Sequence, residues 1–246
     1  MGGFVDWEMW MNYWRGLMFV LRWWRWAFTT PGWVRCRSEE TLVVLLHGVH
    51  EKWLVWNMVA HALAADLPEA CAVWAPYMPA AHVAPLAEAA AGLDTVRQWM
   101  RLRPRGRVIL VGMSNGGRVA ASWEQHLPAE RDVRVLTLGS PLNGTARLDS
   151  VPAALADWHL TPAVHAEMRA GQGAYPAARA HRYVHFAARH DWMVYPPVRA
   201  CLKGNGVRVL EHDGHLSMMV SREVRKAICA EIADPGRDVQ PAGGDE

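Results

Sequence analysis

The hydrophobic positions follow two different patterns, one before and one after Pro31-Gly32. When residues 7–28 are drawn as a helix, the polar side chains gather on one side. The opposite side carries Trp10, Trp14, Leu17, Leu21, Trp24 and Phe28. Phe19 and Trp26 interrupt the polar side, so the separation is incomplete. This first segment is therefore predicted to be an imperfectly amphipathic helix.

From Thr41 onward, apolar runs of strand length alternate with helical patterns. Thr41–His47 (TLVVLLH) is typical of a central strand buried on both faces. Further strands are predicted at 70–75, 107–112, 133–139, 183–187 and 207–211, and helices at 52–67, 84–103, 115–127 and 217–232. Strands that alternate with helices predict an α/β fold, with a mostly parallel sheet and helices on both faces.

An insertion at about 143–181 separates the fourth and fifth of these strands. Thr161-Pro162 has the pattern of a helix start, and Gly171 that of a stop. Such an insertion is expected to cap the carboxyl ends of the strands, where parallel sheets bind ligands. The chain is therefore divided into a segment 1–33, a domain 34–233 and a polar tail 234–246, which is predicted to be disordered.

The segment 1–33 contains seven of the 14 tryptophans. Its three arginines, Arg15, Arg22 and Arg25, argue against a membrane span, and Asp6 and Glu8 argue against a secretory signal. Tryptophan and arginine together favour the headgroup layer of a membrane. We expect a membrane-associated protein on the cytoplasmic side. The alternatives are a cytoplasmic protein in which the segment packs on the domain, a contact with a second copy, or a span.

Charge and cysteine spacing exclude some partners. The net charge of +2 is too small to suggest nucleic-acid binding. The four cysteines lie far apart and form no metal-ligand or redox spacing. No metal or other cofactor is expected.

Gly112-Met113-Ser114-Asn115-Gly116 joins a predicted strand to a predicted helix. Gly-x-Ser-x-Gly is a weak signal alone, but in a strand–turn–helix context it indicates a serine nucleophile. Gly112 and Gly116 supply the small side chains that a tight turn around the nucleophile requires. Ser114 is therefore the expected nucleophile.

A serine nucleophile needs a base and an acid at the same edge of the sheet. His215 follows the last predicted strand, and Asp191 follows the one before it. The order Ser114, Asp191, His215 is that of a Ser-Asp-His triad on a parallel sheet. His212 and Asp213 are the nearest rivals. The backbone N–H groups of Asn115 and Val49 are the expected donors to an oxyanion.

These residues carry a family resemblance. His47-Gly48, the Ser114 turn, Leu138–Pro141, Asp191-x-x-Val194 and Gly214-His215-Leu216 resemble the small bacterial lipases and esterases of the α/β-hydrolase superfamily, and the related inositol-deacylase-like hydrolases. The resemblance covers about residues 41–232 and implies the α/β-hydrolase fold and metal-free ester hydrolysis through an acyl-enzyme. Asn115 departs from the methionine or leucine that is more usual there.

Several functions share this triad. The expectation is hydrolysis of a carboxylic ester, either a small molecule or a lipid. A thioesterase, an amidase or an acyltransferase would use the same residues. A membrane-associated binding scaffold that has kept the fold without the activity is the alternative outside enzymes.

Overall fold

The computed structural model describes most of the domain and a few residues before it. The described residues are 14, 17–18, 21–22, 32–35, 40–48, 53–68, 71–76, 78, 92–145, 162–170, 177–191, 193–194, 196–202, 205–211, 213–215 and 217–233. The predicted disordered tail at 234–246 and most of the segment 1–33 lie outside them. No helix within the described ranges is long and apolar enough to cross a bilayer.

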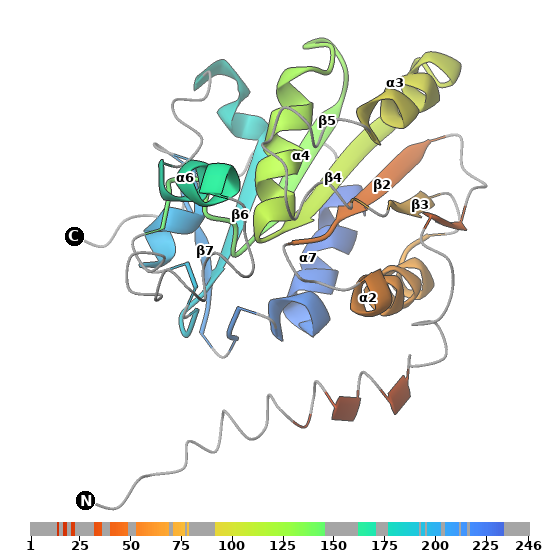
Figure 1. Cartoon of the computed structure of the whole chain (residues 1–246). Helices are drawn as coiled ribbons and strands as arrows, with labels where there is room; N and C mark the ends of the chain where they lie inside the picture. Colours follow the sequence, from red (N-terminus) through yellow and green to blue (C-terminus); the bar gives the residue numbers. More distant parts are fainter. Residues whose placement is uncertain are drawn as a thin grey trace, which may run out of the picture.

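Seven strands in the described residues form one twisted sheet (Figure 1). They are β1 (Gly32–Arg35), β2 (Thr41–Leu46), β3 (Cys71–Ala75), β4 (Arg107–Met113), β5 (Val133–Leu138), β6 (Tyr183–Ala188) and β7 (Arg208–Leu210). The order across the sheet is β1-β3-β2-β4-β5-β6-β7, and every pair is parallel except β1 with β3. The six strands predicted from the apolar runs all occur, each within one residue of its expected ends.

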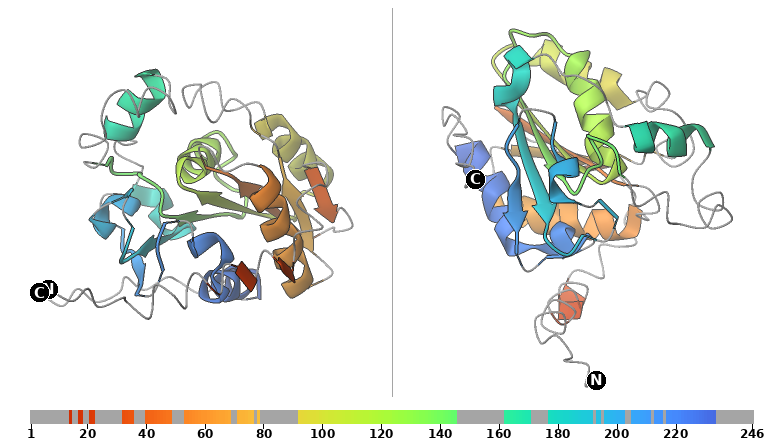
Figure 2. Two further views of the ribbon diagram at one scale, coloured as in Figure 1. Left: turned by 60° about the horizontal axis from the view of Figure 1, so that its bottom comes forward. Right: turned by 90° about the vertical axis from the view of Figure 1, so that its left-hand side faces the viewer.

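Helices cover both faces of this sheet (Figure 2). Side chains from alternate strand positions, such as Val43 and Ile109, pack with α2 (Trp53–Asp66) and α7 (Arg222–Ala233). The intervening positions pack with α3 (Leu93–Leu102) and α4 (Asn115–Gln125) on the other face. This double cover explains why every position of β2 after Thr41 is apolar, because both faces of the strand are buried.

The sheet begins earlier than the sequence indicated. β1 pairs with β3, and Trp33 stacks on Trp74 with ring centroids 5.8 Å apart. Arg35 fixes the strand by donating to the carbonyl oxygens of Cys71 (2.6 Å) and Pro68 (2.7 Å). The expected boundary between residues 33 and 34 was therefore wrong, because Gly32 and Trp33 belong to the sheet. The short strand was missed because tertiary contacts, and not a long apolar run, stabilise it.

The remaining elements lie close to their expected positions. α2 matches its prediction to one residue at each end, whereas the structure describes the α3 region only from residue 92. The predicted helix at 217–232 is a 3-10 turn, η7 (Ser217–Val220), followed by α7. Within the insertion, α6 (Pro162–Ala170) begins and ends where the sequence placed it. Two further 3-10 helices, η5 (Ala177–Arg182) and η6 (Pro197–Ala200), flank β6.

β6 carries a buried neutral histidine, His185, beside Thr137 of β5. The Asn205 amide donates to Nε2 of His185 (3.3 Å), so Nδ1 carries the proton and donates to Thr137 Oγ1 (2.8 Å). Burial lowers the pKa of His185 to about 3, from an ordinary value of 6.5. Its protonation therefore favours the unfolded chain.

We expect this histidine to make the protein acid-sensitive. The pKa of His185 is lower in the folded than in the unfolded protein. The stability that neutral His185 contributes is therefore complete above pH 6.5 and is lost as the pH falls toward about 3. The free energy of unfolding should fall by about 1.4 kcal/mol for each pH unit in that window from this residue alone. The free energy of unfolding, measured with urea at several pH values between 7 and 5, should depend less steeply on pH for His185→Gln than for the wild type. Exposed His181→Gln is the matched control, and equal slopes for all three proteins would contradict the assignment.

Candidate active site

Ser114 lies in a strained turn between β4 and α4. Its φ of 51° and ψ of −124° make it the only residue other than glycine with positive φ in the described part of the chain. Such a backbone conformation is unfavourable for an L-residue and persists only where neighbours enforce it. Here the Ser114 N–H donates to Leu138 O (2.9 Å) at the end of β5, and the Gly117 N–H donates to Ser114 O (3.1 Å).

Three glycines make this turn sterically possible. A methyl carbon on Gly112 would lie 2.4 Å from Gly116 O, and one on Gly116 would lie 2.1 Å from Leu46 O. A methyl carbon on Gly117 would lie 1.9 Å from Ser140 Oγ. The turn is thus in direct backbone contact with the end of β2, and it packs against the Ser140 side chain just after β5. Small residues were expected at Gly112 and Gly116, whereas the need for glycine at 117 arises only from its contact with Ser140.

Asp191 and His215 form a buried pair at the same edge of the sheet. His215 Nδ1 lies 2.7 Å from Asp191 Oδ2, and both side chains are nearly fully buried. Asp191 Oδ1 accepts the backbone N–H groups of Met193 and Val194, each at 2.8 Å. These bonds fix the carboxylate, which accepts the Nδ1 proton of the imidazole. The other ring nitrogen, Nε2, is then the one that a general base would use.

The rival acid, Asp213, has a different partner. Its Oδ1 accepts the hydroxyl of Ser217 (3.0 Å), and the Ser217 Oγ in turn accepts the Gly214 N–H (2.8 Å). Asp213 therefore stabilises the loop that carries His215 and does not contact the imidazole in any described bond. His212 lies outside the described residues.

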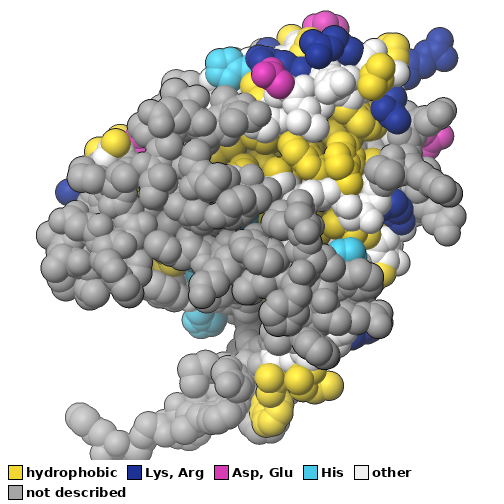
Figure 3. Space-filling model, turned by 45° about the vertical axis from the view of Figure 1, so that its right-hand side comes forward, with side chains coloured by type: hydrophobic (Ala, Val, Ile, Leu, Met, Phe, Trp, Pro, Cys, Tyr) yellow, Lys and Arg dark blue, Asp and Glu magenta, His cyan; other side chains and the backbone are white. Residues whose placement is uncertain are grey.

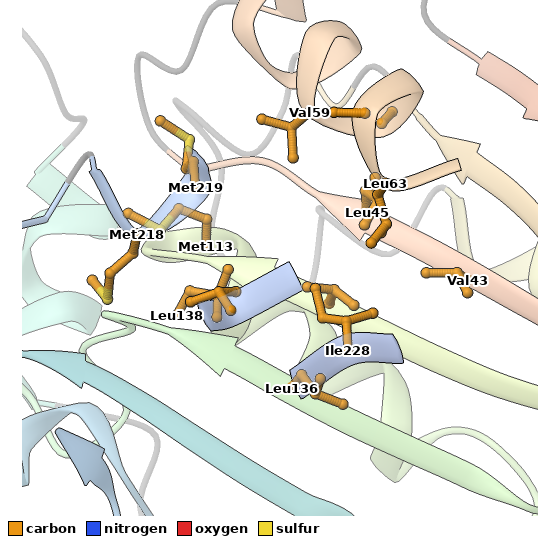
Figure 4. Packing of buried hydrophobic residues seen from close by; sticks show 14 of the residues in the cluster. Val43, Leu45, Val59, Leu63, Met113, Leu136, Leu138, Met218, Met219 and Ile228 are labelled. Atoms are coloured by element: carbon orange, nitrogen blue, oxygen red, sulfur yellow. The ribbon is translucent and has the colours of Figure 1, made fainter. Parts of the chain in front are cut away.

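The end of β5 brings the nucleophile turn and the Asp191–His215 pair together. Leu138 O holds the Ser114 N–H, and the next residue, Gly139, has a φ of +51°. A methyl carbon on Gly139 would lie 2.4 Å from Met218 Cε, 2.9 Å from Asp191 Oδ2 and 3.2 Å from His215 Nδ1. In Figure 4, Met113, Leu138 and Met218 pack together beside this point, within one buried cluster. Ser114 thus contacts the last residue of β5, Leu138, and His215 lies near the residue that follows it, Gly139.

We expect Gly139→Ala to reduce activity much more than stability alone explains. The methyl group would push the Met218 side chain aside and crowd the Asp191–His215 pair, in a backbone conformation that alanine rarely adopts. Turnover per folded molecule should fall roughly 100-fold, because displacements of about 1 Å in a catalytic pair have that effect. Gly214→Ala is the control: it is adjacent to His215, but its methyl carbon would meet only His190 O at 3.7 Å. Equal activities of the two variants would contradict the role of Gly139.

The start of α4 and the end of β2 form the opposite side of the site. Asn115 is the first residue of α4, where backbone N–H groups point out of the start of the helix. The contact of Gly116 with Leu46 O places this helix start against the loop that follows β2. Gly48 is described in that loop, but Val49, the other expected oxyanion donor, lies outside the described residues.

His47 fixes the start of this loop. The Met78 N–H donates to its Nε2 (3.0 Å), so its Nδ1 carries the proton and donates to Gly48 O (2.9 Å). Burial lowers the pKa of His47, partly opposed by the bond to the Gly48 carbonyl. The ring ties the loop after β2 to the segment after β3, and both of its nitrogens are hydrogen-bonded.

The structure adds one charged residue that the sequence did not indicate. Arg118, four residues after Ser114, is a buried side chain whose Nη1 donates to Asn115 Oδ1 (3.3 Å). Its position one helical turn from the nucleophile was visible in the sequence, but the partner could not be deduced. No cluster of three or more His, Cys, Asp or Glu side chains suited to a metal ion occurs among the described residues.

Comparison with known proteins gives similarity in structure only. No protein-family model matches this sequence, and no curated protein matches it. The structure is similar to a type II thioesterase from the borrelidin biosynthetic cluster, with a TM-score of 0.53 at 18% identity, covering 83% of this chain and 96% of that one. A mature lipase of Bacillus licheniformis gives 0.53 at 15% identity, covering 81% and 94% of the two chains. The carboxylesterase CesB of Bacillus subtilis gives 0.51 at 13% identity, covering 94% and 99%.

These similarities agree with the observed topology. The expected parallel sheet with helices on both faces is confirmed. The chain has the α/β-hydrolase fold.

Proposed function

We propose that this protein is a serine hydrolase that cleaves carboxylic esters through a triad of Ser114, His215 and Asp191. One observation carries the proposal: the strained turn at Ser114 is bonded to Leu138 at the end of β5, and the buried Asp191–His215 pair lies against the next residue, Gly139. Strain held in place by backbone contacts is characteristic of functional sites. A serine in such a turn beside an oriented histidine is the arrangement used for acyl transfer.

In the first half of the proposed reaction, Nε2 of His215 takes the proton of Ser114 Oγ as that oxygen attacks the ester carbonyl carbon. The carbonyl oxygen becomes an oxyanion and is stabilised by the backbone N–H groups of Asn115 and Val49, with the dipole of α4 directed at it. Collapse of this intermediate breaks the bond to the alcohol, which leaves with the proton held by His215. An acyl-enzyme on Ser114 remains.

In the second half, His215 takes a proton from water, and the hydroxide attacks the acyl carbon. A second oxyanion forms at the same donors and collapses to release the carboxylic acid, and the proton returns to Ser114 Oγ. Asp191 keeps its bond to Nδ1 of His215 and stabilises the imidazolium that forms twice in the cycle. Each step requires only groups of the chain, the ester and water.

A fluorophosphonate probe tests this proposal directly. The probe should phosphonylate Ser114, as identified by mass spectrometry of the labelled peptide, and Ser114→Ala should not be labelled. Lack of reaction in the folded wild type would favour the binding scaffold. Hydrolysis of matched ester, thioester and amide substrates of the same acyl chain would then separate an esterase from a thioesterase or an amidase, and added alcohol acceptors would reveal an acyltransferase.

We further propose that the substrate is lipid-like and that the N-terminal segment binds a membrane surface. Its described helical residues Trp14, Met18 and Leu21 are 55%, 60% and 57% exposed. Hydrophobic side chains are visible in Figure 3 at the lower end of the molecule, where Figure 1 places the N-terminal residues. Large apolar side chains gathered on one segment favour association with an apolar phase, and the arginines between them suit anionic headgroups.

Removal of residues 1–30 is expected to release the protein from vesicles that contain anionic lipid. The deletion ends before β1, because Gly32 and Trp33 are part of the sheet. Hydrolysis of a small soluble ester should persist, whereas activity on dispersed lipid should fall. A triple variant, Trp14→Ser with Met18→Ser and Leu21→Ser, should reproduce the loss of vesicle binding in the full chain. Cosedimentation of both variants with vesicles would contradict the membrane role.

A further inference from the structure

A buried arginine connects the nucleophile helix to the insertion. The Arg118 side chain is only 1% exposed, although it carries a permanent charge. Arginine is seldom buried to this degree unless its charge is matched and its N–H groups are bonded. Arg118 is the fourth residue of α4, three residues after Asn115, the proposed oxyanion donor.

Arg118 has contacts on two sides. Nη1 donates to Asn115 Oδ1 at 3.3 Å, and Nη2 lies 3.8 Å from Glu167 Oε2. Asn115 is nearly fully buried beside Ser114, whereas Glu167 belongs to α6 and is partly exposed. α6 lies beside α4 (Figures 1 and 2). One side chain therefore joins the first residue of the nucleophile helix to the insertion.

A second charged residue of α4 shows what a purely structural pair looks like. Glu124, near the other end of the helix, is fully buried and bonded to Arg182 Nη1 (2.7 Å), Tyr183 Oη (2.9 Å) and Arg179 Nη1 (3.1 Å). This cluster lies at the amino end of β6, away from Ser114. The Arg118–Glu167 pair has a longer N–O distance than the bonds of Glu124, and Glu167 is partly exposed to solvent. Arg118 also contacts Asn115, a residue of the candidate site, which Glu124 does not.

We propose that Arg118 is a positioning residue that couples the seating of α6 to the orientation of Asn115. By holding the Asn115 side chain, Arg118 orients the first turn of α4, whose N–H group stabilises the oxyanion. By contacting Glu167, it makes that orientation depend on where α6 lies. This role rests on the proposed function, because it acts through the oxyanion donor. It extends that function by making the insertion a determinant of turnover and not only of substrate fit.

If Arg118 joins Asn115 to Glu167, substitutions of Asn115 and Glu167 should have non-additive effects on turnover. Asn115→Ala keeps the backbone N–H but removes the oxygen that Arg118 binds, and Glu167→Gln removes the charge at the other end. Each should lower kcat for a small soluble ester by roughly five-fold or more, with little change in KM, because the transition state is affected and ground-state binding is not. The double variant should be no slower than the worse single variant.

Removal of Arg118 should abolish this coupling. In an Arg118→Met background, Glu167→Gln should have no further effect on kcat. Arg118→Lys keeps the charge but lacks the planar fork that reaches two partners, so it should not restore kcat. Arg169→Gln, which removes an exposed charge from the same helix α6, is the matched control and should leave kcat unchanged. All rates are expressed per reactive Ser114, titrated with the fluorophosphonate probe, so that a loss of folded protein does not count as a loss of turnover.

The outcomes separate this proposal from the proposed function. A wild-type Ser114 that does not react with the probe would overturn both. A reactive wild type with multiplicative, independent losses in the Asn115→Ala and Glu167→Gln variants would overturn the role of Arg118 alone. If Arg118→Met does not fold, the double-mutant cycle of Asn115→Ala and Glu167→Gln still tests whether the two residues are coupled. Glu167 is partly exposed, and its substitution leaves the charge of Arg118 in place.

Discussion

Ser114→Ala should abolish ester hydrolysis while leaving the fold intact. The triad residues act as a unit, so loss of the nucleophile should lower kcat by roughly 10⁴-fold or more. The backbone of the turn does not depend on the hydroxyl, because the Ser114 N–H and C=O groups are both bonded. Turnover of a soluble ester and the thermal unfolding midpoint are the two measurements. Full activity in the folded variant would place the nucleophile elsewhere.

Ser114→Gly adds a test of the strain at this position. Glycine adopts positive φ without steric cost, so this variant should be equally inactive but more stable than Ser114→Ala by about 1 kcal/mol. The gain is limited because glycine also increases the conformational entropy of the unfolded chain. Urea unfolding of the two variants at the same pH gives the difference directly. Equal stabilities would indicate that the turn at Ser114 holds little strain.

The central strands could be predicted from the sequence because burial on both faces leaves an uninterrupted apolar run. β2 and β4 read as such runs, and the structure places them side by side at the middle of the sheet. β1 gave no such signal, since four residues at an edge are held by a stacked tryptophan pair and by the side chain of Arg35. Local pattern therefore identified the core strands, and tertiary contacts decided the edge.

Some residues of the candidate site could likewise be predicted from local pattern, and others depend on tertiary contacts. Position after a strand was sufficient to choose Asp191 and His215, because parallel strands end at one edge of the sheet, and the structure brings the two side chains together. Gly139 and Arg118 could not be assigned from the sequence. Their importance arises from contacts with residues far along the chain, Asp191 and Met218 for Gly139 and Glu167 for Arg118. A single sequence does not reveal such contacts.

Asp191→Asn is expected to lower kcat by roughly 10⁴-fold, because the asparagine would hold His215 in the wrong tautomer. The N–H groups of Met193 and Val194 would keep the amide oxygen at the Oδ1 position. The amide NH₂ would then face Nδ1 of His215 and donate to it, so that the ring proton moves to Nε2. A base protonated at Nε2 cannot accept the proton of Ser114. The backbone bonds that orient the native carboxylate would thus also orient the asparagine amide, and this explains why a large loss of kcat is expected.

Asp213→Asn is the matched control for this substitution, since Asp213 lies two residues from His215 and its carboxylate bonds only to the Ser217 hydroxyl among its described contacts. An asparagine oxygen can accept the same hydroxyl, so kcat should change by less than roughly ten-fold. Both variants should keep thermal unfolding midpoints close to that of the wild type, because neither leaves a buried backbone donor unbonded. Turnover of a small soluble ester, expressed per folded molecule, distinguishes them. The reverse order of effects would make Asp213 the acid of the triad and would require the loop that carries His215 to rearrange during catalysis.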